Sequence, residues 1–128
     1  MNTRCVLLVS PDSSALEQAL APFRNDGFSV RAAKSLAEAL PLLDPLSPPS
    51  LVLLDARQDA DGSALRRDAM AVLSRCALTY LSAVSQLDSH AFHDAMEGLG
   101  MLPPLPAQPT AEDGAALLAT LRKFLPQG

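Results

Sequence analysis

The residues of this chain best suited to chemistry are carboxylates and hydroxyls that follow short apolar runs. Asp55 ends the run 51–54, Asp12 follows the run 5–9, and Ser82 ends the segment 77–82. A carboxylate in such a place can attack an electrophile or bind Mg²⁺, which prefers oxygen ligands. A hydroxyl nearby can bind the oxygens of a transferring group. The pattern therefore indicates a candidate site for group transfer, with Asp55 as its central residue.

Each of these residues also has a purely structural interpretation. Asp55 can cap local backbone donors, and Asp12 can be a helix N-cap, because Asp is a preferred residue there. Ser82 can satisfy a backbone group instead of a ligand oxygen. Asp59 and Asp61 can either reach a metal or remain in a solvated loop. The sequence leaves these alternatives open.

The elements that must position these residues follow from the hydrophobic pattern. Short apolar runs occupy residues 5–9, 28–32, 51–55, 77–82 and 100–102. Amphipathic helical patterns alternate with the runs, and this alternation is typical of a parallel sheet covered on both faces. We therefore predict an α/β fold of the flavodoxin-like (βα)5 type, a three-layer sandwich around a five-stranded parallel sheet. In such sheets, ligands bind beyond the carboxyl ends of the strands.

Capping residues and prolines indicate where the helices begin and where they are interrupted. The first helix can be capped by Asp12, Ser13 or Ser14, and Ser14 could form a capping box with Glu17. The other predicted caps are Ser35 with Glu38, Asp88 and Thr110. Pro22 and Pro41 should kink or shorten their helices, because proline lacks the backbone donor that a helix needs.

With these residues in place, the chain resembles the receiver domain of two-component response regulators, the fold of the chemotaxis regulator. The resemblance covers nearly the whole chain and depends on residues 6–12, 51–55 with Gly62, 78–83 and 98–106. It implies that Asp55 is the phosphoacceptor and that Ser82 binds phosphoryl oxygens. It also implies a Mg²⁺ ion held by Asp55 together with acids after the first strand, of which only Asp12 is present.

The chain departs from the family at positions that the chemistry needs. The acidic pair falls on Ser10 and Pro11, the lysine after the fifth strand on Leu105, and the aromatic switch residue on Leu102. The Mg²⁺ site of Asp12 and Asp55 is thus weak and incomplete. We expect a degenerate pseudo-receiver without enzymatic activity that acts through protein–protein interaction. The alternatives are an authentic Mg²⁺-dependent phosphoacceptor, phosphorylated on Asp55, and a small flavodoxin-like ligand-binding protein.

Composition restricts the domain organisation and the partners. With 128 residues, the chain is expected to form a single receiver-like domain over 1–128. A net charge of −4 argues against nucleic acid or an anionic membrane as a partner. The short apolar run 5–9 cannot cross a bilayer, so we expect a cytoplasmic protein. By family analogy, a histidine kinase or downstream signalling protein would bind the face of the fourth helix, fifth strand and last helix, and a homodimer is possible.

Overall fold

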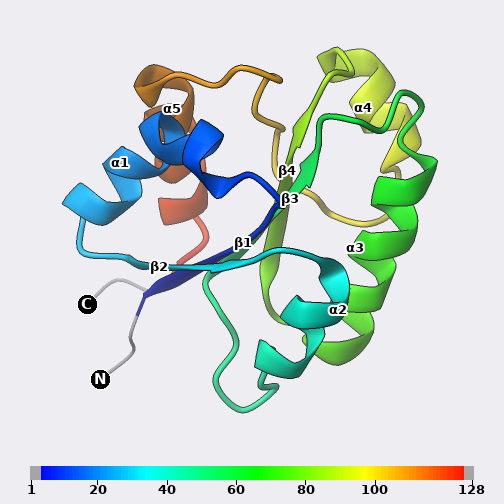
Figure 1. The fold of residues 1–128 in the computed structure, drawn as a ribbon. Helices are drawn as coiled ribbons and strands as arrows, with labels where there is room; N and C mark the ends of the chain where they lie inside the picture. Colours follow the sequence, from blue (N-terminus) through cyan, green and yellow to red (C-terminus); the bar gives the residue numbers. More distant parts are fainter. Residues whose placement is uncertain (1–3, 126–128) are drawn as a thin grey trace.

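The computed structural model describes residues 4–125, in which a parallel sheet lies between two layers of helices (Figure 1). The strands are β1 (Cys5–Val9), β2 (Ser29–Ala33), β3 (Leu51–Ala56) and β4 (Tyr80–Ser85), in the order β2-β1-β3-β4. The central strands β1 and β3 are continuous apolar runs because both of their faces are buried. This arrangement confirms the predicted α/β three-layer class.

The helices divide between the two faces of the sheet. They are α1 (Glu17–Asn25), α2 (Leu36–Ala39), α3 (Ser63–Arg75), α4 (Ser89–Ala95) and α5 (Ala111–Arg122), with 3-10 turns η1 (Ser13–Leu16) and η2 (Leu40–Leu42). Helices α1 and α5 pack on one face, and α2, α3 and α4 cover the other (Figure 1). Within residues 4–125, no helix is long and apolar enough to cross a membrane.

The predicted helix starts are confirmed at three of four places. The side chains of Ser35, Asp88 and Thr110 each accept a hydrogen bond from a backbone N–H of the following helix. The predicted Ser14–Glu17 box is wrong, because Ser14 itself lies within η1 and α1 begins only at Glu17. Asp12 is at the N-cap position of η1, but its side chain makes no capping hydrogen bond. As predicted for Pro41, the helix α2 is short and gives way to η2.

The predicted fifth strand is wrong, and the sheet of the described residues has four strands. Residues 101–106 do run along β4, where the Leu102 N–H donates to Leu81 O and the Leu105 N–H to Ala83 O, both at 2.8 Å. Pro103 and Pro104 lie between these two contacts and have no N–H to donate. The prolines therefore leave only an isolated bridge, between Val84 and Leu105, where a fifth strand was expected.

Candidate functional site

The carboxylate of Asp55 is held by its own neighbours at the carboxyl end of β3. Arg57 donates from Nε to Oδ1 at 2.9 Å and from Nη2 to Oδ2 at 2.7 Å. The Arg57 backbone N–H donates to Oδ1 at 3.2 Å, and the Ser10 hydroxyl donates to Oδ2 at 2.6 Å. A carboxylate offers about four acceptor directions, and four donors are directed at this one. The Asp55 side chain is only 5% exposed, so its hydrogen-bonding capacity is filled within the protein.

The strand register brings these three residues together. Val9 pairs with Leu54 across β1 and β3, so Ser10 follows β1 beside Asp55. Arg57 lies two residues after Asp55, which places it on the same side of an extended chain. The Ser10 hydroxyl also accepts from the Asp12 N–H at 3.0 Å, and Gln86 Nε2 donates to Arg57 O at 2.9 Å. The ends of β1, β3 and β4 therefore all contribute to this arrangement.

The charges of the pair stabilise each other. Burial of the Asp55 carboxylate acts to raise its pKa, but the hydrogen bonds from Arg57 and Ser10 outweigh burial and lower the pKa below its usual value. Hydrogen bonding to Asp55 raises the pKa of Arg57 despite partial burial, and the negative charge of Asp12 adds to the rise. Asp55 is therefore anionic and Arg57 cationic at neutral pH.

The residues around Asp55 do not fit a Mg²⁺ ion. The guanidinium of Arg57 and the hydroxyl of Ser10 already take the acceptor directions of the carboxylate that a metal would use. The second predicted ligand, Asp12, accepts from the Ser14 hydroxyl at 2.9 Å, and its side chain caps no helix. Among the residues that the structure describes, no three His, Cys, Asp or Glu side chains are grouped to hold a metal. The positive charge beside Asp55 is that of Arg57.

The acids of the following loop serve the start of α3. Asp59 accepts from the Gly62 N–H at 3.1 Å and from the Leu65 N–H at 2.8 Å. Asp61 accepts from both the N–H and the hydroxyl of Ser63, and these bonds lower its pKa. Both carboxylates are thus engaged at the N-terminus of α3, where negative charge is favourable.

The structure does not bring Ser82 to Asp55. Ser82 pairs with Leu53, whereas Asp55 pairs with Val84, about 6–7 Å further along the strand. The buried Ser82 hydroxyl donates to Pro103 O at 2.8 Å, where it supports the proline-interrupted edge of the sheet. The hydroxyl at the strand end belongs to Ser85, because β4 begins at Tyr80, three residues later than predicted. It accepts from the Leu87 N–H at 3.1 Å.

Arg57 is the important residue that the sequence analysis missed. The sequence did contain a pattern that could have identified Arg57. Asp55 and Arg57 are two residues apart across the end of a strand, and this spacing places both side chains on one face.

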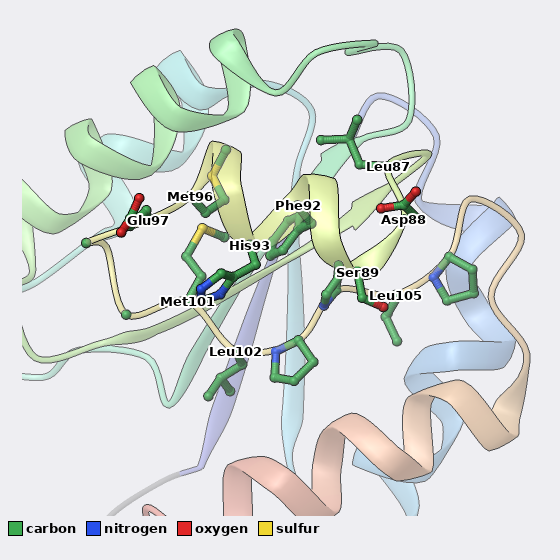
Figure 2. A pocket seen from close by; sticks show the side chains of 15 residues that line it. Leu87, Asp88, Ser89, Phe92, His93, Met96, Glu97, Met101, Leu102 and Leu105 are labelled. Atoms are coloured by element: carbon green, nitrogen blue, oxygen red, sulfur yellow. The ribbon is translucent and has the colours of Figure 1, made fainter.

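A second feature of the same half of the molecule is a groove between α4 and residues 98–106, with a volume of about 740 Å³ (Figure 2). Its floor includes Phe92, Met96, Leu102 and Leu105, whose side chains are largely buried. The exposed His93 also lines this groove, while His90 contacts Asp94 at 3.4 Å.

Comparison with known proteins identifies the fold. No protein-family model matches the chain, and no curated protein matches it in sequence. A response regulator from Thermotoga maritima is similar in structure, with a TM-score of 0.77, 15% identity and coverage of 94% of this chain and 98% of that chain. The non-phosphorylated HemR receiver domain from Leptospira biflexa gives a TM-score of 0.74 at 21% identity, covering 98% and 99%. The chemotaxis response regulator CheY4 of Vibrio cholerae gives 0.70 at 19% identity, covering 96% and 99%. The chain therefore has the receiver-domain fold.

Proposed function

We propose that this protein is a pseudo-receiver of two-component signalling: a cytoplasmic module that is not phosphorylated, has no enzymatic activity and acts by binding another protein. The observation that carries the proposal is the Asp55 carboxylate, which is bound by Arg57 and Ser10 through both of its oxygens. The receiver fold of its structural neighbours supports the general setting in signalling.

The contacts of Asp55 oppose phosphoryl transfer in two ways. To attack phosphorus, a carboxylate oxygen must release its donors, and charge-assisted hydrogen bonds are about twice as strong as neutral ones. Transfer also depends on cations that neutralise the moving oxygens. Arg57 already pairs with the nucleophile, and Leu105, only 2% exposed, stands where the family resemblance expects lysine. This site is built to hold its own charge pair.

The binding surface that we propose is the face of α4, residues 101–106 and α5. Leu102, at the position of the family's aromatic switch residue, is buried at 5% exposure and has no hydroxyl or ring to reorient. A partner such as a histidine kinase or a downstream signalling protein would therefore meet a surface that does not depend on phosphorylation.

One observation keeps an authentic phosphoacceptor as the second candidate. Asp55 lies at the carboxyl end of a buried strand and its pKa is lowered, so it is in the anionic form that a nucleophile needs. In this case phosphorylation would have to break the pair with Arg57.

A phosphodonor experiment separates the two candidates. The protein is incubated with Mg²⁺ and acetyl phosphate or beryllofluoride, and intact mass and amide spectra are recorded for the wild type and Asp55→Asn. An active receiver domain in the same tube shows that the donor works. We expect no adduct and no Mg²⁺-dependent shift near Asp55. An adduct that disappears in Asp55→Asn overturns the pseudo-receiver.

A further inference from the structure

The groove beside α4 combines an apolar floor with acidic ends. Figure 2 shows Phe92, His93 and Met96 in a row along α4, with Asp88 and Glu97 at opposite ends of the row. Met101 lines the opposite wall and is partly exposed. Asp88 and Glu97 are nine positions apart in the sequence, which corresponds to about two and a half helical turns, or roughly 14 Å at the helical rise per residue.

The charge of this region has one sign. The stretch 86–109 contains Asp88, Asp94 and Glu97 but neither Lys nor Arg. The nearest described cation that contacts α4 is Arg66, whose guanidinium donates to the backbone oxygens of Ala95 and Glu97 at 3.1 and 2.9 Å. Arg66 therefore binds backbone oxygens at the C-terminal end of α4. Among the described residues, the lining of the groove contains Asp88, Glu97 and the basic side chain of His93 but neither Lys nor Arg.

We propose that this groove binds an amphipathic helix of a partner protein, with apolar residues on one side and Lys or Arg flanking them. This inference deepens the proposed function and rests on it for the idea that the α4 face binds a protein. Apolar grooves take helices through side chains spaced i, i+3, i+4 and i+7. The flexible side chains of Met96 and Met101 can adapt to such anchors. Basic residues two to three turns apart would meet Asp88 and Glu97.

Charge also distinguishes this occupant from a second copy of the chain. Two copies that met through this face would place Asp88, Asp94 and Glu97 near the same acids of the partner, and like charges facing each other oppose association. The net charge of −4 adds to the repulsion. A basic helix has no such penalty.

The test uses two designed 18-residue helical peptides with the same leucine positions, one with Lys and one with Glu on the polar face. Binding to the full chain is followed by calorimetry and by amide shifts. We expect saturable binding of the Lys peptide, shifts centred on residues 87–106 and weaker binding at higher salt. Binding of both peptides alike, or shifts centred elsewhere, overturns the inference.

Matched variants separate the groove from general attraction to an acidic protein. Glu97→Lys should weaken binding about threefold, and Met101→Gln about fivefold, from a lost charge pair and lost apolar contact. The controls change the same residue types elsewhere: Glu17→Lys on α1 and Met70→Gln on α3, where Met70 is 51% exposed. Both controls should leave the affinity for the Lys peptide unchanged. Equal losses in the controls overturn the inference.

The inference and the proposed function fail in different experiments. If sedimentation shows that the wild type forms dimers and that Met101→Gln does not, the occupant of the groove is a second copy of the chain. That result overturns the inference. A phosphoryl adduct on Asp55 overturns the pseudo-receiver but leaves peptide binding at the groove intact. If neither peptide binds and Asp55 forms no phosphoryl adduct, the proposal for the groove is overturned and the pseudo-receiver proposal stands.

Discussion

Two regions of the molecule use carboxylates in opposite ways. The strand-end site consists of Asp55, Arg57 and Ser10, and the α4 groove lies between α4 and residues 98–106. At the strand end, Asp55 is buried and each of its oxygens accepts from Arg57, with Ser10 as a further donor. At the groove, Asp88 and Glu97 are exposed beside an apolar floor, and neither forms an ion pair with a Lys or Arg of the described residues, although Asp88 also accepts from the Ala91 N–H as the cap of α4. A carboxylate that is paired within the chain contributes to stability, whereas one that faces solvent can select a partner. This difference is why we propose that recognition occurs at the groove rather than at the strand end.

The difference arises from the nearest basic residue in each case. Arg57 lies two residues after Asp55, in reach of a bidentate contact. The stretch 86–109 contains no Lys or Arg, and within it the exposed His90 contacts Asp94 rather than Asp88 or Glu97. The following variants each disturb one region and test whether the other is independent of it.

The largest effect is expected for Gly62→Ala, which disturbs the groove. Gly62 has φ +84°, and an added Cβ would lie 2.9 Å from Ala95 Cβ and 3.3 Å from Met96 Cε. Left-handed backbone and overpacking together should lower the free energy of unfolding by about 2–4 kcal/mol, measured by urea denaturation. Gly27→Ala, with φ +92° and nothing within 4 Å, is the control and should cost only about 1 kcal/mol. Equal losses would show that Gly62 does not hold α4 in place.

Arg57→Ala disturbs the strand-end site and comes next. It leaves the Asp55 carboxylate, 5% exposed, with fewer donors, so the free energy of unfolding should fall by about 1–3 kcal/mol. Amide shifts should spread over the ends of β1, β3 and β4 and leave residues 92–102 unchanged. Arg67→Ala, on the exposed side of α3, is the control and should fall within about 0.5 kcal/mol of wild type. A loss no larger than the control would contradict the role of Arg57.

Ser82→Ala tests the edge of the sheet that forms one wall of the groove. It removes the donor to Pro103 O at a site where Ser82 is fully buried. The expected loss is about 1–2 kcal/mol, and the amide protons of Leu102 and Leu105 should exchange faster. Unchanged exchange of these two amides would mean that the other backbone bonds hold this segment without Ser82.

The smallest change in the free energy of unfolding is expected when the pH is lowered into the acidic range. The pKa of Asp55 is lower in the folded chain than in the unfolded one, where it is about 3.9. The stabilisation is therefore complete above roughly pH 5, where the unfolded carboxyl is also ionised, and is lost as the pH falls through the folded pKa. Denaturation of wild type and Asp55→Asn at a series of acidic pH values should show a shallower loss for Asp55→Asn. Parallel curves would contradict the lowered pKa.

Much of the fold could be predicted because the signals are local. The strand 5–9 and the caps Asp88 and Thr110 follow from apolar runs and from side chains that reach the next few residues. The absence of a fifth strand and the position of β4 could not be predicted in this way. Hydrogen bonding to a neighbouring strand decides where an apolar run becomes a strand. Prolines at the edge of the sheet interrupt that bonding.

The candidate site divides in the same way. The sequence alone was enough to place Asp55 at the carboxyl end of a buried strand. It was also enough to show that the acids, lysine and aromatic residue expected from the resemblance are replaced. The surroundings of Asp55 depend on the folded chain. The parallel register of β1 and β3 brings the Ser10 hydroxyl to the Asp55 carboxylate, and Arg57 folds back onto it. Side chains that are 45 residues apart meet only when strands pair. The sequence therefore determined which groups are present, and strand pairing decided that they bind each other.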